Sequence, residues 1–375
     1  MKSSTCTHGL TALSANFALY GDLSDRMMSL ASGLGPRQEI YSIDESFIDL
    51  TGVRGDMVER SHKIRSRILQ WVGIPCGIGI GSTKTLAKLA NHIAKTAERK
   101  PGSYPERLAQ VCNLATLSTV ELEAVLAATP VGEVWGVGRR ISAQLIEGGI
   151  HTVLDLVRMD PATVNRKWSV VLERTVRELQ GMSCINLEHA PQPKQEIACT
   201  RSFGQPITEL HELEEAITEF ASRAAQKLRK QSSLAGQVIC FVRTSPFRQD
   251  PQYSRSVTVP LRRPSADTAY IVAAALTGLR AIYRPGFKLA KAGVMLIELQ
   301  SDTFQQQELA LEDDEVVDRG MLMTTLDGLN LRYGRGTVLM ASAGLGGNRR
   351  TWSMKQERRT PAYTTDWNDM AVARA

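Results

Sequence analysis

The 375-residue sequence lacks several features that would assign a protein to a class at once. No apolar run approaches the roughly 18 residues that a membrane-spanning helix needs, and the N-terminus has no apolar core of a signal peptide. The six cysteines are scattered, and no two of them form a CxxC pair. This spacing favours reduced thiols over a disulfide framework or a zinc site. These absences predict a cytoplasmic protein that is not bound to a membrane.

The positive charge of the chain is concentrated in one segment. The formal net charge is only +6, but thirteen Lys/Arg residues and two acids fall between Arg223 and Lys291. Residues 301–318 contain seven acids and no base. A basic segment of this density fits a polyanionic partner, because neutralised phosphates release their counterions. The alternative is a basic surface that is merely solvated.

The patterns along the chain predict several domains, which its length also favours. Residues 17–97 predict helix, hairpin, helix, strand and helix in that order, an α+β arrangement without an internal repeat. Residues 106–185 predict helices throughout, and the polar, proline-containing segment 188–196 predicts a linker. Residues 197–300 predict the order βαββαβ. The rest is an acidic segment and a region rich in Gly and Arg, which we expect to be partly disordered.

The helix predicted at 82–97 has two unlike faces. Its polar residues Lys84, Lys88, Asn91 and Lys95 lie opposite its apolar residues at 100° per residue. Ser82 or Thr83 would cap its N-terminus, where a phosphate binds favourably. The P-loop pattern GxxxxGK[ST] is absent, because Ile78 and Thr83 stand where it needs glycine. We predict phosphate binding for Lys84, whereas a solvated face explains Lys88 and Lys95 equally well.

A glycine turn between two predicted helices has the features of a helix-hairpin-helix. Gly136 and Gly138 flank Val137, and Arg139 and Arg140 follow directly. Such a turn points backbone N–H groups at a DNA phosphate and binds without regard to sequence. A plain inter-helix turn is the alternative. The downstream I-x-T-V-x-D-L stretch at 150–156 stands at the spacing of these motifs and favours the DNA-binding interpretation.

Asp44 and Glu45 stand together between two short predicted strands. A solvated hairpin turn is the simplest explanation of such a pair. The neighbouring apolar residues would instead bury the hairpin in a core and leave the two acids at the edge of a packed sheet; they are Ile40, Ile43, Phe47, Ile48 and Leu50. Hard divalent ions bind such carboxylates, and phosphoryl transfer by two metals needs them to hold the attacking and leaving oxygens.

Several motifs in order resemble the Y-family translesion DNA polymerases, and the UmuC branch in particular. The S-I-D-E-S-F stretch is similar to the family signature, and the Gly-rich stretch after it to the second palm motif. The matching segments are Ser42–Phe47, Gly77–Asn91, Val134–Ser142, Val171–Leu179 and Lys194–Ile197. The resemblance covers nearly the whole chain, from about Asn16 to Trp367.

The resemblance implies a multidomain α+β fold. Its parts would be a palm (1–104) of βαββαβ type without its first strand, an all-α thumb with the helix-hairpin-helix (105–187), a linker (188–196), a βαββαβ little finger (197–300), and an acidic linker with a tail (301–375). The basic segment falls on the implied little finger, where composition had already indicated a polyanion.

The resemblance also implies roles for single residues. Asp44 would bind both Mg²⁺ ions, Glu45 would hold the catalytic ion near the primer 3′-hydroxyl, and Lys84 would contact the incoming triphosphate. The residues implied to contact DNA are Gly136, Gly138, Arg139, Arg140, Arg243, Arg248, Arg255 and Arg262.

The partners implied by the resemblance are damaged primer–template DNA, a deoxynucleoside triphosphate, a UmuD-like accessory subunit and a recombinase filament. Related proteins carry a sliding-clamp peptide of the Q-L-x-L-F kind. This chain has Gln307–Glu312 at that place, and no aromatic residue ends the segment. Clamp binding is therefore expected to be weak or absent.

The sequence departs from the family pattern at its beginning. The family starts with a strand that carries another metal-bridging Asp in a D-x-N-x-F/Y segment, whereas this sequence joins the pattern only near Asn16. Asp22 and Asp25 lie on the first predicted helix and cannot replace that residue. We therefore expect an N-terminally truncated translesion polymerase subunit of the SOS mutagenesis type, impaired in template-directed nucleotidyl transfer.

Two alternatives come from other functional classes. The first is a non-catalytic remnant that docks on damaged DNA through its thumb and little finger. The second is a nucleotide cyclase with a similar palm, against which the helix-hairpin-helix and the basic C-terminal domain argue.

Overall fold

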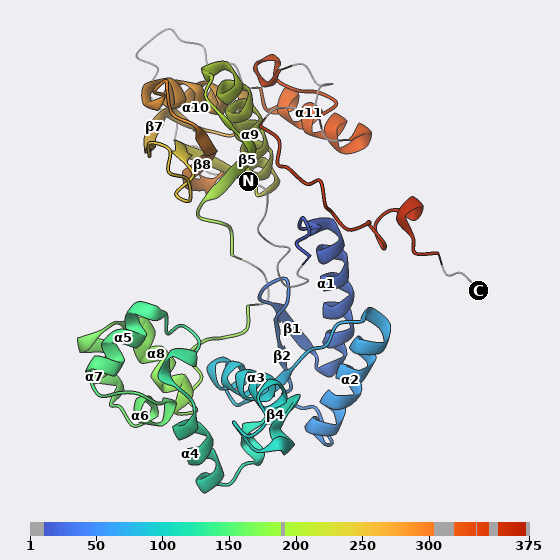
Figure 1. Ribbon diagram of the computed structural model, residues 1–375, viewed down its shortest axis with the longest axis vertical. Helices are drawn as coiled ribbons and strands as arrows, with labels where there is room; N and C mark the ends of the chain where they lie inside the picture. Colours follow the sequence, from blue (N-terminus) through green and yellow to red (C-terminus); the bar gives the residue numbers. More distant parts are fainter. Residues whose placement is uncertain (1–10, 189–191, 304–318, 335, 345–351, 373–375) are drawn as a thin grey trace. The chain divides into compact units, whose positions relative to one another are not determined.

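The computed structural model describes residues 11–188, 192–303, 319–334, 336–344 and 352–372 (Figure 1). These residues form two compact units. Unit 1 comprises residues 1–191 and 359–375, and unit 2 comprises residues 192–358. No helix of the described part is both long enough and apolar enough to cross a membrane.

The first part of unit 1 has the predicted order of elements. The elements are α1 (Phe17–Ala31), β1 (Arg37–Ile40), β2 (Ser46–Asp49), α2 (Met57–Val72), β3 (Ile78–Ile80) and α3 (Lys84–Arg99). Asn16 caps α1 through a hydrogen bond from the Leu19 backbone N–H, and Asp56 caps α2 in the same way. Gly73 ends α2 in the left-handed conformation, with φ of 77°. Helix, hairpin, helix, strand and helix are thus confirmed.

The expectation that residues 106–185 are helical throughout is wrong at one place. Val111–Asn113 forms a short strand, β4, which pairs parallel with β3. A three-residue strand has no periodicity of its own, so only its partner 33 positions earlier identifies it. The implied all-α thumb therefore contains a strand that belongs to the sheet before it.

The remaining α-helices of unit 1 contribute side chains to one buried cluster with the apolar face of α3. They are α4 (Thr119–Ala128), α5 (Arg139–Glu147), α6 (Val153–Val157), α7 (Pro161–Lys167) and α8 (Val170–Leu179). Leu89 and Ile93 of α3 share one buried cluster with Leu145, Leu156 and Val176. This shared core fixes the glycine turn of the predicted helix-hairpin-helix relative to α3.

Unit 2 has the predicted βαββαβ order. Its elements are β5 (Ile197–Ile207), α9 (Leu210–Lys230), β6 (Ser233–Thr244), β7 (Ser254–Ser265), α10 (Thr268–Ile282) and β8 (Leu289–Ser301). The strands form one antiparallel sheet in the order β5-β8-β6-β7. Both helices cover the face of that sheet on which Val238, Cys240 and Val242 are buried (Figure 1).

The region after residue 301, expected to be partly disordered, contains two ordered features within the described residues. Gly320–Tyr333 forms helix α11, and Asp327 makes a two-bond ion pair with Arg229 of α9, at 2.7 and 2.8 Å. Trp352 is buried against Phe220, with ring centroids 5.7 Å apart. The predicted clamp segment, Gln307–Glu312, lies outside the described residues.

Candidate functional site

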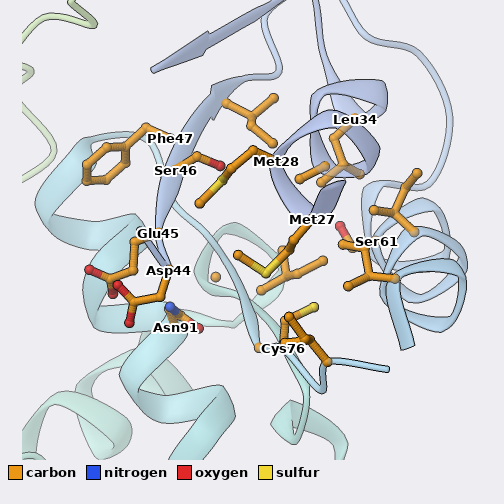
Figure 2. Close-up of a pocket in the computed structure, with 18 of the residues that line it drawn as sticks. Met27, Met28, Leu34, Asp44, Glu45, Ser46, Phe47, Ser61, Cys76 and Asn91 are labelled. Carbon is orange, nitrogen blue, oxygen red and sulfur yellow. The ribbon is translucent and has the colours of Figure 1, made fainter. Parts of the chain in front are cut away.

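Asp44 and Glu45 lie in the loop that joins β1 to β2. The strands pair from Arg37↔Asp49 to Ile40↔Ser46, and the backbone N–H groups of Tyr41 and Ser42 both donate to the Glu45 carbonyl at 3.0 Å. The Ser42 hydroxyl donates to Asp44 Oδ1 at 2.6 Å, which orients that carboxylate. Figure 2 shows both acidic side chains on the same side of the hairpin, near Asn91 of α3.

The hairpin is less buried than its apolar residues predicted. Phe47 is buried, but Ile40 and Ile43 are 61% and 55% exposed. Ile40 ends β1 and Ile43 lies in the loop beyond it, so the cluster around Met27 and Met28, which packs against Ile48 on the same sheet face, does not cover them. The two acids therefore project from a small sheet.

Lys88 connects the polar face of α3 to this hairpin. Its Nζ lies 2.5 Å from Glu45 Oε2, and 4.9 Å and 5.8 Å from the ring centres of Tyr41 and Trp135. The Trp135 Nε1–H also donates to the Tyr41 hydroxyl at 3.3 Å. Since Trp135 precedes Gly136, the glycine turn and the acidic hairpin are in direct contact. Lys88 is therefore a paired, largely buried lysine and does not belong to a solvated helix face.

Lys84 already has a carboxylate partner. Its Nζ lies 2.5 Å from Glu39 Oε2, and both side chains are at most 10% exposed. The same Glu39 oxygen accepts a hydrogen bond from the Glu188 backbone N–H at 2.7 Å. Phosphate binding by Lys84 remains a prediction, and it requires that the phosphate compete with Glu39. No local pattern in the sequence indicated Glu39 as the partner.

The glycines before α3 serve close packing. A Cβ atom at Gly79 would lie 2.1 Å from the Asn91 backbone nitrogen and 2.3 Å from the Ala87 carbonyl oxygen. At Gly81 it would lie 2.7 Å from the Ala87 backbone nitrogen. β3 therefore approaches the backbone of α3 more closely than any side chain permits. This agrees with the exclusion of a P-loop from the sequence.

Glu178 of α8 is a site residue that the sequence did not indicate. It is 0% exposed, and its carboxylate accepts hydrogen bonds from the backbone N–H groups of Thr85, Cys184 and Ile185 at 3.0, 2.7 and 3.0 Å. The Thr83 hydroxyl donates to the Glu178 carbonyl at 2.9 Å. Glu178 thus fixes the N-terminus of α3, from which Lys84 and Lys88 extend.

The glycine turn lies between a three-residue 3-10 helix, Val131–Glu133, and α5, so only the second of the two predicted helices is an α-helix. Gly136 adopts φ of 89°, in the region that disfavours side chains. Gly138 precedes α5 without a side-chain cap, and Arg139 and Arg140 beside it are exposed. Downstream, Thr152 and Asp155 form a capping box that begins α6, and the hydrogen bonds from Thr152 hold the pKa of Asp155 below its usual value. This box explains why the I-x-T-V-x-D-L stretch has its pattern.

The two glycines should respond differently to substitution. A Cβ at Gly138 would meet nothing within 4 Å, and its φ of −77° suits any residue. Gly138→Ala should therefore leave stability within about 0.5 kcal/mol of the parent, whereas Gly136→Ala should cost about 1 kcal/mol or more in strain. Thermal unfolding measures both. Equal destabilisation by the two variants would contradict the assignment of the strained position to Gly136.

The four arginines predicted on unit 2 do not share one face. Arg243 pairs in register with Ser254 and alternates with buried Val242, so it lies on the sheet face opposite α9 and α10. Arg262 lies on the same face, at the exposed positions of β7. Arg255 pairs in register with Val242, so it lies on the sheet face that carries the helices, and its guanidinium is 5.8 Å from the ring centre of buried Tyr253. Arg248 lies in the loop between β6 and β7.

The candidate site offers oxygen ligands to a hard divalent cation. Mg²⁺ is commonly bound by one or two carboxylates, with water and substrate phosphates completing the shell. Asp44 and Glu45 meet this requirement. Within the described residues no group of three or more His, Cys, Asp or Glu side chains gathers as a metal site. Because Glu45 also pairs with Lys88, a cation there would share that carboxylate with an ammonium group.

Family comparisons cover most of the chain. Residues 2–92 match the impB/mucB/samB family, and residues 194–309 match the C-terminal domain of that family. Residues 321–373, which include all of α11 but its first residue and also Trp352, match a domain of unknown function, DUF4113. The family match begins at residue 2, whereas the motifs indicated that the resemblance begins near Asn16.

Individual relatives show the same relationship. The chain is 42% identical to Protein UmuC of Salmonella typhimurium over 370 residues, which span 96% of this chain and 84% of that protein. It is 37% identical to Protein MucB of Escherichia coli, over 98% of this chain and 84% of that protein. A solved Y-family DNA polymerase chimera of Dbh and Dpo4 shares the fold with a TM-score of 0.57 at 18% identity, over 76% of this chain and 78% of that one.

Proposed function

Because the chain belongs to the UmuC-like branch of the Y-family DNA polymerases, we propose that it is an error-prone translesion polymerase subunit acting on damaged primer–template DNA. The proposed reaction is template-directed nucleotidyl transfer, in which a primer 3′-hydroxyl attacks the α-phosphate of a deoxynucleoside triphosphate and pyrophosphate leaves. The observation that carries the proposal is the pair Asp44–Glu45 on a hairpin held against α3 by Lys88.

Asp44 and Glu45 are the proposed metal ligands. Mg²⁺ bound there would supply Lewis-acid chemistry, lowering the charge on the triphosphate and favouring the deprotonated 3′-hydroxyl. Ser42 would keep Asp44 in one orientation through its 2.6 Å hydrogen bond. Lys88 would keep Glu45 from turning away from the hairpin, and it adds positive charge beside the position proposed for the triphosphate.

The proposed domains follow the family, with one adjustment. Residues 1–104 would form the palm, 105–187 the thumb and 197–300 the little finger. Because β4 pairs with β3, residues 111–113 are better assigned to the palm. The glycine turn and the basic face of unit 2 would hold the duplex through phosphates, by backbone N–H groups in the first case and arginines in the second. A UmuD-like accessory subunit and a recombinase filament are proposed partners on family resemblance alone.

We further propose that this chain alone binds primer–template DNA but incorporates nucleotides poorly. Two carboxylates gather at the site in the described ranges, and one of them is paired with Lys88. Two divalent ions held by so few acids would repel each other with little compensation.

The test uses the purified chain with a labelled primer–template, Mg²⁺ and all four deoxynucleoside triphosphates. We expect a gel shift with primer extension at background. Asp44→Asn should leave DNA affinity within about twofold, since phosphate contacts dominate binding. Robust extension that Asp44→Asn abolishes would overturn the proposed impairment while supporting the polymerase function. Failure to bind DNA at low salt would overturn the polymerase function itself.

A non-catalytic DNA-docking protein is the second candidate, favoured by the basic face of unit 2. The two functions differ in what Asp44 does in cells. If the chain contributes a catalytic site, Asp44→Asn abolishes damage-induced mutagenesis. If it only docks, that variant behaves as the parent does and loss of the unit 2 arginines removes the phenotype.

A further inference from the structure

The loop between β6 and β7 carries the most exposed aromatic side chain of the described residues. Phe247 in this loop is 93% exposed. Single exposed apolar residues are common on protein surfaces and call for no explanation by themselves. Phe247 differs from such residues in two respects, because hydrogen bonds fix its loop and because the charged groups around it are mostly positive.

Hydrogen bonds within the loop fix the position of Phe247. The Arg248 backbone N–H donates to the Ser245 carbonyl at 3.3 Å, which closes a turn with Phe247 near its centre. The Gln252 side-chain N–H₂ group donates to three loop carbonyls at 3.1, 3.0 and 3.0 Å, those of Ser245, Arg248 and Asp250. An ordered loop therefore presents the ring to solvent, so little ordering is needed when a partner binds.

The loop before β8 lies beside the β6–β7 loop. Phe287 stacks on Tyr253 with ring centroids 4.6 Å apart, and the Tyr253 hydroxyl donates to the Ile282 carbonyl. Lys288 Nζ lies 3.2 Å from Asp250 Oδ1. The two loops therefore form one end of the unit 2 sheet, and Phe247 projects from it.

This end of the sheet is basic. Residues 245–256 and 283–288 contain four Lys/Arg residues and one acid, a balance of +3. The acid, Asp250, already lies within 4.0 Å of two of the four cations. The other two, Arg255 and Arg284, are exposed and lie 5.8 and 5.9 Å from the centre of the buried tyrosine ring. An exposed phenyl ring thus stands beside cations that attract a polyanion.

We propose that Phe247 is a stacking platform for an unpaired base of single-stranded DNA, and that the basic end of the sheet binds the phosphates on either side of that base. Aromatic rings beside cations hold single strands without regard to their sequence. The inference rests on the proposed function for the choice of DNA and deepens it. The site would hold unpaired template, whereas the open sheet face would hold the duplex.

The chemistry of the site favours an unpaired base over other occupants. The bases of a duplex are stacked on one another, so a protruding ring meets only phosphates, sugars and groove edges there. An unpaired base offers a free face on which a phenyl ring can stack. An apolar protein surface would cover the ring, but it would also remove water from the neighbouring arginines without giving them partners.

The test measures binding of the full chain to labelled DNA by fluorescence anisotropy. The probes are a single strand of about twelve nucleotides, the same strand with abasic residues throughout, and a blunt duplex. We expect Phe247→Ala to weaken binding to the single strand about tenfold and to leave binding to the other two probes within about twofold. The loss should be the same at every salt concentration, because a phenyl ring releases no counterions.

Matched variants connect the effect to stacking. Phe247→Leu keeps an apolar side chain but has no aromatic face, so it should weaken binding almost as much as Phe247→Ala. Phe247→Trp should bind at least as tightly as the parent. Arg248→Ala should flatten the slope of log affinity against log salt by about 0.7, the value for one phosphate of a single strand. Phe17→Ala on α1 removes another ring, which is 65% exposed, and should change nothing.

Several results would overturn the proposal. An equal loss on the abasic strand would show that the ring supports the loop and not a base. Parent-like binding by Phe247→Leu would show a merely apolar contact. Self-association that Phe247→Ala abolishes, without an effect on the single strand, would identify a second copy of this chain as the occupant.

The failure of this inference is distinct from the failure of the proposed function. If Phe247→Ala binds the single strand as the parent does and primer–template binding is retained, the stacking site is wrong and the proposed function stands. If the parent chain binds none of the probes at low salt, the proposed function is wrong as well.

Discussion

Replacing Arg243 and Arg262 together with alanine should weaken binding to a primer–template about 60-fold at 0.1 M salt. Each phosphate contact contributes about 0.9 to the slope of log affinity against log salt, and the electrostatic contribution vanishes near 1 M. Loss of two contacts should therefore flatten the slope by about 1.8. Both arginines lie on the sheet face of unit 2 that α9 and α10 leave uncovered. Fluorescence anisotropy over a salt series measures both quantities.

Arg280→Ala is the matched control for this variant. Arg280 is on α10, on the other side of the sheet, and its Nε lies 2.7 Å from Glu214 Oε1. Its loss should leave the salt slope unchanged. Replacing Arg248 and Arg255 together with alanine tests the other two predicted contacts. Arg255 lies on the opposite sheet face from Arg243, and Arg248 lies in the loop between β6 and β7. If this pair flattens the slope and the first pair does not, DNA lies along the β6–β7 loop and the assignment to the open face is wrong.

Glu178→Ala should destabilise unit 1 by about 3 kcal/mol. The substitution leaves one buried and two partly buried backbone N–H groups without their acceptor, and each such loss costs up to about 1–3 kcal/mol, less where water can reach the group. The gain from no longer burying a carboxylate offsets part of the sum. Glu178→Gln keeps the volume but turns an amide N–H₂ toward a backbone donor, so we expect about half the effect. Urea unfolding of the purified chain, followed by exchange of the α3 amides, gives the free energies.

Glu173→Ala is the control on the same helix. Glu173 is partly buried, pairs with Arg177 one turn later and accepts a hydrogen bond from the Asn165 side chain, but it accepts none from the backbone N–H groups that Glu178 holds. Its loss should therefore cost about 1 kcal/mol, well below the effect at Glu178. Should Glu178→Ala prove as mild as this control, Glu178 does not hold the N-terminus of α3. A large effect would explain why α8 matters to the site although it contains none of the predicted metal ligands.

Much of the architecture could be predicted from the sequence because it depends on local patterns. Alternation and helical spacing are set by backbone geometry within a few residues, so the βαββαβ order of unit 2 and the helices around the acidic hairpin were correctly placed. The same holds for the turn at Gly136, since its positive φ restricts the residue type. The motifs indicated the family because each is a short stretch whose residue types can be recognised without knowing the tertiary structure.

The tertiary structure alone decided which partners these residues have. Lys84 meets Glu39 across 45 positions, and Glu178 meets Thr85 across 93. Helical periodicity placed Lys88 on a polar face, but only packing directs that face toward Glu45 rather than to solvent. Likewise β4 exists through pairing with β3, and the basic segment divides between two sides of a sheet. The local sequence determines the backbone conformation of a segment and the chemistry of its side chains. Which distant groups meet depends on how the elements pack, because no short stretch encodes its distant neighbours.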